Sequence, residues 1–399
     1  MRSISTRPLV SAAENQSDNE DGDNELGLVD FCCGPSSSKE HSSCSSTISS
    51  MCSALSEKAH PLAAEKSRNF NQSRTESILS NLCDLYSRKE LSGNLCNLVC
   101  ASPRNWTVID FHQGANKRVL RINSNGTEFV LKTTKDYFNE FPQKLDPMID
   151  EEELTDKIVE LVNEQTKLGY PLPYKKHLIQ TLWADYDLKK DGPQLSTADR
   201  NSLWTLLQQD EFITFNLLPL SRVTTKVIGS CGHFYGTEAV LPFHMKSYYM
   251  GLKAKILVHL MGTLKLFFEF LNEPLQWCDV NFSNLGLSAA KPKRFVVLDA
   301  DMLYTESKLN SILEARTCKN DADCTFFDCT AKCNNSTGFC GTRANDNIDV
   351  FCQKLIGKLF GNFWSKSNRY LAACHDTSGN SSKRLADLRL VWSWSLNEI

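Results

Sequence analysis

Two aspartates and an asparagine between positions 277 and 302 have the residue types and the spacing that phosphoryl transfer requires. Asp279 and Asn284 lie five positions apart in a loop that follows a long apolar helix, and Asp299 ends a short buried strand. In phosphoryl transfer an aspartate accepts the hydroxyl proton, while an asparagine and a second aspartate hold the divalent ions that bridge the phosphates. A surface loop followed by a strand with exposed acids explains this segment equally well, so the segment alone leaves both interpretations open.

The order of the motifs along the chain favours the phosphoryl-transfer interpretation. Protein kinases carry a strand lysine, then an acidic helix, then a catalytic loop of the H-R-D-L-x-x-x-N type, then a D-F-G motif. Here Lys132 ends an expected strand, and an acidic helix is expected at 150–165. Asp279 and Asn284 follow with the D-x-x-x-x-N spacing, and Asp299 begins an Asp-Ala-Asp sequence in the D-F-G position. Four matches in the right order are stronger than any one of them.

A small antiparallel sheet followed by a helical part is expected to position these side chains. Three segments with strand patterning, separated by turn residues at Gly114 and Asn125–Gly126, predict strands at 106–111, 118–122 and 128–132. Apolar spacing predicts helices at 77–87, 197–217 and 252–271, and strands within 226–241 and at 295–298. This mixture predicts an α+β fold.

Sixteen cysteines, clustered rather than scattered, indicate either an oxidising compartment or a bound metal. One group contains Cys83, Cys96 and Cys100, and a second contains six cysteines from Cys318 to Cys352. The second group lacks CxxC pairs and has few histidines nearby, so disulfides are favoured over zinc, although six cysteines alone allow fifteen pairings. Eight N-x-S/T triplets also favour the secretory route.

The N-terminal residues 1–75 are rich in Ser, Asn, Asp and Glu and poor in aromatic residues, so we predict a disordered tail there. The chain has a formal net charge of −3, which gives no support for nucleic acid as a partner. The tail contains no apolar signal-peptide core, and no run of about 18 apolar residues occurs that could span a membrane. We therefore expect a signal or anchor to lie outside this chain.

Several segments together resemble the divergent protein kinase domain (DIPK) family, which comprises kinase-like proteins of the endoplasmic reticulum. The resemblance covers roughly residues 77–375. It is carried by FVLK at 129–132, GSCGHFYGTEA at 229–239, the C-D-V-N-F-S-N loop that contains Asp279, and the cysteine-rich stretch CKNDADCTFFDCTAKC at 318–333. The cysteine-rich stretch is quite specific to the family, where it replaces the usual activation segment and A-P-E motif.

The resemblance implies a divergent, two-lobed, protein-kinase-like α+β fold with a disulfide-rich C-terminal region. The N-lobe is expected at 76–241, with a degenerate EF-hand-like insert near 185–199. The C-lobe is expected at 242–399 and includes the cysteine-rich segment 318–352.

The resemblance also implies roles for the site residues. Lys132 is expected to contact the phosphates of ATP and to pair with a helix glutamate, for which Glu153 is chosen with little margin over Glu152. Asp279 is expected to be the catalytic base. Asn284 and Asp299 are expected to hold Mg²⁺ or Mn²⁺, and Asp301 in the same turn is a further candidate.

Two departures from the kinase pattern leave the activity open. No G-x-G-x-x-G loop precedes Lys132, so the backbone clamp on the phosphates is weakened or absent. Asn281 stands where kinases usually carry a lysine, which removes a positive charge from the place where phosphate charge develops. Asn281 also begins an N-x-S triplet. An active kinase and a catalytically inactive pseudokinase, acting as a disulfide-braced scaffold or regulator, remain as alternatives.

The EF-hand-like insert supplies weak candidates for Ca²⁺. Asp187 and Asp191 occupy positions one and five of a D-x-D-x-D-G pattern, and Asp199 is the candidate terminal carboxylate. Lys189 occupies position three, where an oxygen ligand belongs and an ammonium would repel Ca²⁺. A polar turn that caps the following helix is the favoured interpretation.

The expected partners and location follow from the same resemblance. A nucleotide is expected as a ligand, and an unknown protein or glycan of the secretory pathway is expected as a substrate or partner. The expected location is the lumen or membrane of the endoplasmic reticulum, with membrane association implied by the resemblance alone. A cytosolic protein with reduced cysteines is a weaker alternative that native disulfides would eliminate.

Overall fold

The computed structural model describes residues 61–101, 106–142, 145–146, 148–217, 223–243, 250–287, 294–361, 369–376 and 380–390. These residues belong to one compact unit. Helix α3 (Pro61–Ser87) begins well before the predicted helix at 77–87, so the disordered tail predicted for residues 1–75 is wrong for 61–75. The rest of that prediction, residues 1–60, lies outside the described residues.

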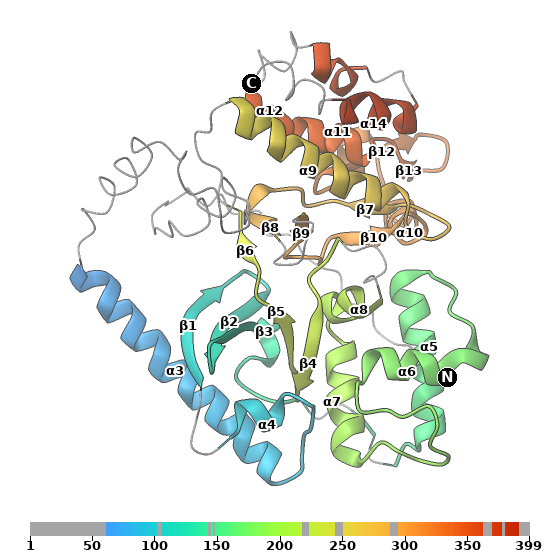
Figure 1. The fold of residues 1–399 in the computed structure, drawn as a ribbon. Helices are drawn as coiled ribbons and strands as arrows, with labels where there is room; N and C mark the ends of the chain where they lie inside the picture. Colours follow the sequence, from blue (N-terminus) through green and yellow to red (C-terminus); the bar gives the residue numbers. More distant parts are fainter. Residues whose placement is uncertain are drawn as a thin grey trace. The chain divides into compact units, whose positions relative to one another are not determined.

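An antiparallel sheet of five strands forms the first half of the described fold (Figure 1). Its order is β1-β2-β3-β5-β4. The strands are β1 (Trp106–Gln113), β2 (Lys117–Ser124), β3 (Thr127–Thr134), β4 (Val227–Cys231) and β5 (Phe234–Glu238). Asn125 and Gly126, both with positive φ, make the tight β2–β3 turn that the sequence predicts. Lys132 is paired in register with Tyr235 of β5.

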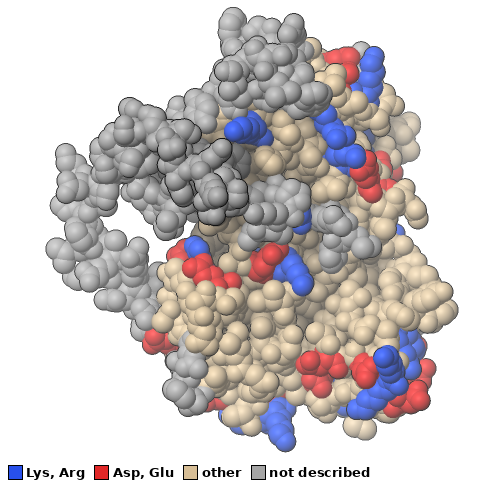
Figure 2. Space-filling view, in the orientation of Figure 1, with Lys and Arg blue, Asp and Glu red and all other residues tan. Residues whose placement is uncertain are grey.

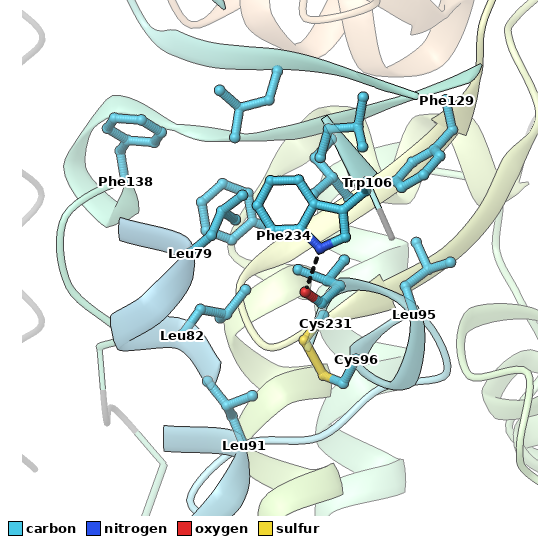
Figure 3. Packing of buried hydrophobic residues seen from close by; sticks show 14 of the residues in the cluster. Leu79, Leu82, Leu91, Leu95, Cys96, Trp106, Phe129, Phe138, Cys231 and Phe234 are labelled. Atoms are coloured by element: carbon cyan, nitrogen blue, oxygen red, sulfur yellow. Dashed lines mark hydrogen bonds between the residues drawn. A yellow bond between two sulfur atoms is a disulfide. The ribbon is translucent and has the colours of Figure 1, made fainter. Parts of the chain in front are cut away.

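A hydrophobic core beneath this sheet is sealed by α3 and the short helix α4 (Cys96–Val99). Figure 3 shows Leu79 and Leu82 of α3 packed close to Phe234 of β5. Trp106 Nε1 of β1 donates a hydrogen bond of 2.7 Å to Val99 O of α4. The disulfide Cys96–Cys231 joins residues 135 positions apart. Closing a loop of that length stabilises the fold by about 5 kcal/mol through the entropy of the unfolded chain.

Within the described residues, four α-helices lie between β3 and β4. They are α5 (Glu151–Thr166), α6 (Lys175–Leu182), α7 (Thr197–Leu207) and α8 (Asp210–Leu217). The single helix predicted at 197–217 is therefore wrong, because the chain breaks at Gln208–Gln209. At this break the side-chain amide of the buried Gln209 bonds to two backbone groups: its Oε1 accepts from Thr134 N at 3.0 Å, and its Nε2 donates to His233 O at 2.9 Å.

The second half of the described fold is built around α9 (Met250–Phe268), the helix that the apolar spacing at 252–271 predicts. Edge-to-face contacts join Phe267, Trp277 and Phe351 into its core. Five short strands flank the loops that contain Asp279 and Asp299. They are β6 (Leu241–Pro242), β7 (Leu275–Trp277), β8 (Leu285–Leu287), β9 (Phe295–Val297) and β10 (Leu303–Thr305). The later helices are α10 (Glu306–Glu314), α11 (Asn347–Phe351), α12 (Gly357–Phe360) and α14 (Ser381–Arg389).

The cysteine-rich segment folds as a small sheet of β11 (Thr325–Phe326), β12 (Cys329–Asn334) and β13 (Phe339–Arg343). All twelve cysteines within the described residues form disulfides, which confirms the prediction of disulfides over zinc. The pairs are Cys83–Cys100, Cys96–Cys231, Cys278–Cys329, Cys318–Cys333, Cys324–Cys340 and Cys352–Cys374. Three partners, Cys231, Cys278 and Cys374, come from outside the cysteine groups that the spacing suggests.

The surface of the described part mixes both signs of charge. On the face seen in Figure 2, Lys and Arg side chains lie next to Asp and Glu side chains in small groups. No helix among the described residues is long and apolar enough to cross a membrane.

Candidate active site

The side chain of Lys132 extends from β3 into the interior of the protein. Its Nζ lies 3.4 Å from each carboxylate oxygen of Glu211 and donates a hydrogen bond of 2.5 Å to Leu298 O. The ring of Phe215 lies 4.8 Å from the same nitrogen. The Lys132 side chain is only 9% exposed, and this burial lowers its pKa although Glu211 acts in the opposite direction.

The glutamate that pairs with Lys132 is Glu211 on α8, so the predicted pairing with Glu153 is wrong. Glu153 lies in the first turn of α5, where its exposed carboxylate pairs with Lys157 at 2.7 Å. Glu152 faces Lys175 instead. The acidic residues in the first turn of α5 stabilise the positive end of that helix dipole. Glu211 lies in the first turn of α8, just after the break between α7 and α8.

Glu211 is the centre of the buried polar network. Its side chain is 1% exposed and accepts hydrogen bonds from the Tyr235 hydroxyl and from Ala300 N, the latter at 3.0 Å. Burial alone would raise the pKa of Glu211, but Lys117 and Lys132 outweigh it and lower that pKa to about 2. The carboxylate is therefore ionised and holds both lysines.

Lys117, the first residue of β2, is a site residue that the sequence reasoning missed. Its Nζ lies 2.8 Å from Glu211, 2.9 Å from Asp299 and 2.7 Å from Asp301. Burial works to lower the pKa of Lys117, yet the three carboxylates together hold it above its ordinary value. The sequence offered one indication of this role: no Gly-rich loop occurs in the turn just before Lys117, so another group is needed to contact phosphate.

Asp299 and Asp301 form the more open side of the same cluster. Their side chains are 45% and 27% exposed, and Asp301 N donates to Asp299 Oδ1 at 3.3 Å. Burial raises the pKa of Asp301 to about 7, with Glu211 and Asp299 adding to the effect and Lys117 opposing it. Two ammonium groups thus face three carboxylates, which leaves an excess of negative charge.

Asp279 and Asn284 lie together, as their spacing predicts. Asn284 Nδ2 donates to Asp279 Oδ2 at 2.9 Å and to Asp279 O at 3.2 Å. Burial raises the pKa of Asp279. Leu298 N donates to Asn284 O at 2.9 Å, so the loop is tied to the residue that precedes Asp299.

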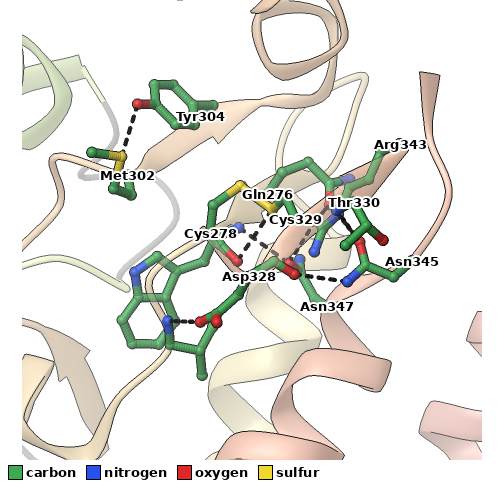
Figure 4. The surroundings of a disulfide bond; sticks show 12 residues. Gln276, Cys278, Met302, Tyr304, Asp328, Cys329, Thr330, Arg343, Asn345 and Asn347 are labelled. Atoms are coloured by element: carbon green, nitrogen blue, oxygen red, sulfur yellow. Dashed lines mark hydrogen bonds between the residues drawn. A yellow bond between two sulfur atoms is a disulfide. The ribbon is translucent and has the colours of Figure 1, made fainter. Parts of the chain in front are cut away.

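The loop that carries Asp279 is braced by the cysteine-rich segment (Figure 4). The disulfide Cys278–Cys329 fixes the residue before Asp279. Asp328 N donates to Cys278 O at 2.8 Å, and Asp328 Oδ2 accepts from Val280 N at 2.7 Å. Lys354 pairs with the same carboxylate at 2.7 Å. Asp328 is a second residue that the sequence reasoning missed.

The structure does not bring the calcium candidates together. Asp199 forms a capping box with Ser196 at the start of α7, and its other oxygen accepts from Ser92 Oγ at 2.6 Å. Asp187 accepts from Lys189 N at 2.9 Å. Among the described residues, Asp187, Asp191 and Asp199 do not form a group whose carboxylate oxygens converge.

A group suited to a divalent ion does occur at the predicted nucleotide site. Oxygens of Glu211, Asp299 and Asp301 lie within 4.8 Å of one another. Because its Nδ2 is turned to Asp279, the Asn284 amide has its Oδ1 free to serve as a further oxygen donor. Carboxylate and amide oxygens are the donors that Mg²⁺ and Mn²⁺ prefer, so the residues fit such an ion.

One family model matches this chain. Residues 203–377 match a family described as the protein-kinase domain of FAM69, a divergent kinase family. The matched range contains Glu211, Asp279, Asn284, Asp299 and the cysteine-rich segment, and it starts after Lys117 and Lys132. The match confirms the prediction of a divergent kinase domain.

Proposed function

We propose that this protein binds ATP with a divalent ion and transfers phosphate to a hydroxyl group, because residues 203–377 match the model described as the protein-kinase domain of FAM69. The acceptor is a protein or glycan of the secretory pathway. The six disulfides of the described residues support an oxidising compartment, such as the lumen of the endoplasmic reticulum.

The observation that carries the proposal is the double role of Leu298. Its carbonyl oxygen accepts from Lys132, and its N–H donates to Asn284 O. One peptide segment therefore joins the strand lysine, the catalytic-loop asparagine and the adjoining Asp299. An exposed loop beside an unrelated strand, the alternative that the sequence left open, would not give this convergence.

Each residue has a distinct task in the proposed reaction. Asp279 accepts the proton of the attacking hydroxyl, and Asn284 Nδ2 orients its carboxylate. Asn284 Oδ1 and Asp299 would hold Mg²⁺ or Mn²⁺, which neutralises charge on the phosphates when bound. Lys132 keeps Glu211 and α8 in place beside Leu298 and Ala300.

A pseudokinase is the second candidate function, and the environment of Asn281 favours it. Asn281 is exposed and caps the short helical turn Phe282–Asn284, where its side chain accepts from Ser283 N at 3.4 Å. A neutral capping residue thus stands where kinases carry a cation. In this case the site would transfer no phosphate, and the protein would act as a disulfide-braced scaffold or regulator.

Thermal unfolding of the full chain, secreted by a eukaryotic host, tests the proposal. ATP at about 100 times its Kd should stabilise the protein by about 2.7 kcal/mol, and only when Mg²⁺ or Mn²⁺ is present. Asp299→Ala should abolish the shift. The matched control Asp387→Ala, on the exposed face of α14, should keep it.

A phosphotransfer assay then separates the two candidates. For a kinase, Asp279→Asn should lower kcat by at least about 100-fold with little change in ATP affinity. Metal-dependent ATP binding without any transfer by the wild-type chain would support the pseudokinase. A well-folded chain that no ATP–metal combination stabilises would contradict the kinase and would support the disulfide-braced scaffold.

A further inference from the structure

The turn between β1 and β2 lies where a kinase places its Gly-rich loop, but this turn is built differently. Only Gly114, Ala115 and Asn116 separate the two strands. Arg118 Nη1 donates to Gly114 O at 2.7 Å and to Lys117 O at 2.9 Å, which holds the turn closed. A turn so short cannot wrap backbone N–H groups around phosphates as a Gly-rich loop does.

The turn instead places the ammonium group of Lys117 at the site. Lys117 follows it directly, and its ammonium contacts Glu211, Asp299 and Asp301. Glu211 belongs to the closed interior, whereas Asp299 and Asp301 are on the open side. Lys117 therefore connects the buried network to the carboxylates where an ion and phosphates would enter.

Lys132, the lysine that the kinase pattern assigns to phosphate, is poorly placed for that contact. An ammonium group has three donors. Those of Lys132 face the two Glu211 oxygens and Leu298 O, and Phe215 lies against the same nitrogen. Lys132 would have to give up its hold on α8 or on Leu298 to reach a phosphate.

We propose that Lys117 is the phosphate-contacting lysine of this site and replaces the missing backbone clamp. This inference rests on the proposed function. Without nucleotide, the Lys117 ammonium pairs with Asp299 and Asp301. With nucleotide and a divalent ion, Asp299 and Asp301 would hold the ion and would release Lys117. Lys117 then donates to phosphate oxygens while Glu211 continues to hold it.

Nucleotide affinities of Lys117→Met test the proposal by isothermal titration with ATP and AMP in the presence of Mg²⁺. A lost charge-assisted contact should weaken ATP binding by about 10- to 100-fold. The affinity for AMP should change much less, so the ATP-to-AMP affinity ratio should fall. Arg121→Met is the matched control, because Arg121 is also a β2 cation but pairs with Glu128, and it should keep the wild-type ratio.

A second readout uses Mn²⁺ alone. Without the competing ammonium, the three carboxylates should bind Mn²⁺ about tenfold more tightly in Lys117→Met than in the wild type, because ligand charge sets the affinity of such sites. If Lys117→Met fails to fold, Lys117→Gln removes the charge but keeps an N–H donor for the carboxylates, and the same fall in the ATP-to-AMP ratio is expected.

The outcomes separate this inference from the proposed function. An unchanged ATP-to-AMP ratio in the Lys117 variants, with metal-dependent ATP binding intact, overturns the role of Lys117 and leaves the proposed function standing. A wild-type chain that binds no ATP overturns both. A fall in the ratio for Arg121→Met as well would show that the effect belongs to the charge of β2 as a whole, and would also overturn the proposal.

Discussion

Glu211 is the residue on which the two lysines of the site depend. It lies within 3.4 Å of Lys132 and 2.8 Å of Lys117, and it also accepts from Tyr235 and Ala300. A buried carboxylate with this many donors is stabilised as an anion, which agrees with its lowered pKa. Removing its charge would leave the buried Lys132 without its carboxylate partner, while Lys117 would keep Asp299 and Asp301.

We expect Glu211→Gln to lower the free energy of unfolding by about 3 kcal/mol or more, because one partner of a buried ion pair is removed. Urea denaturation of the oxidised chain, followed by tryptophan fluorescence, measures it. Glu153→Gln is the control, since its exposed pair with Lys157 contributes about 0.5 kcal/mol or less. Equal free energies of unfolding for Glu211→Gln and the wild type would show that the charge of Glu211 does not stabilise the buried network.

The sequence predicted the site residues whose spacing is local and missed those placed by tertiary packing. Asp279 and Asn284 are five positions apart and meet as expected. Glu211 lies 79 positions after Lys132, beyond the five glutamates of the acidic helix α5. It reaches the lysine from a separate helix, α8, and no local pattern in the sequence predicts that long-range contact.

At the scale of elements, the cysteine-rich segment acts as a brace for the loop that carries Asp279. Asp328 binds the backbone on both sides of Asp279, through Cys278 O and Val280 N. Ordinary kinases position this region with an activation segment, which the resemblance implies is replaced here. The brace was not predictable, because the sequence shows a cysteine cluster but not that Cys329 reaches Cys278.

Asp328→Ala should loosen the loop without unfolding the protein. The amide of Val280 loses a charge-assisted hydrogen bond, so its hydrogen exchange should accelerate by about 10- to 100-fold. Exchange in β2 and β3 should stay unchanged. The control Asp323→Ala removes an acceptor elsewhere in the same segment, and its effect should stay near Lys319 and Asn320. Slow exchange at Val280 in Asp328→Ala would mean that the disulfide alone holds the loop.

At the scale of the whole molecule, one buried histidine links stability to pH. His233 is 3% exposed, contacts Phe141 and Phe234, and has no hydrogen-bond partner on either ring nitrogen among the described residues. Burial lowers its pKa from 6.5 to about 3. The folded protein therefore keeps His233 neutral, while the unfolded chain takes up a proton as the pH falls below 6.5.

Stability should fall with this protonation. The contribution of His233 is fully present above pH 6.5, the unfolded pKa, and is lost progressively as the pH falls toward 3. Relative to His233→Leu, the wild type should lose up to about 1.4 kcal/mol of unfolding free energy per pH unit within this window. Urea denaturation from pH 7 to pH 4.5 measures the difference. His177→Leu, at an exposed position of α6, should keep the wild-type slope; parallel pH profiles for wild type and His233→Leu would contradict the assignment.

The disulfide Cys278–Cys329 determines when, during synthesis and oxidation of the chain, the Asp279 loop becomes fixed. The cysteine beside Asp279 emerges from the ribosome 51 residues before its partner. A nascent chain that has exposed the whole Asp279 loop still lacks the covalent tie and the Asp328 contacts that hold it. The loop around Asp279 thus reaches its braced conformation only after Cys329 has been both synthesised and oxidised, so an oxidation step, and not synthesis of the loop alone, completes it.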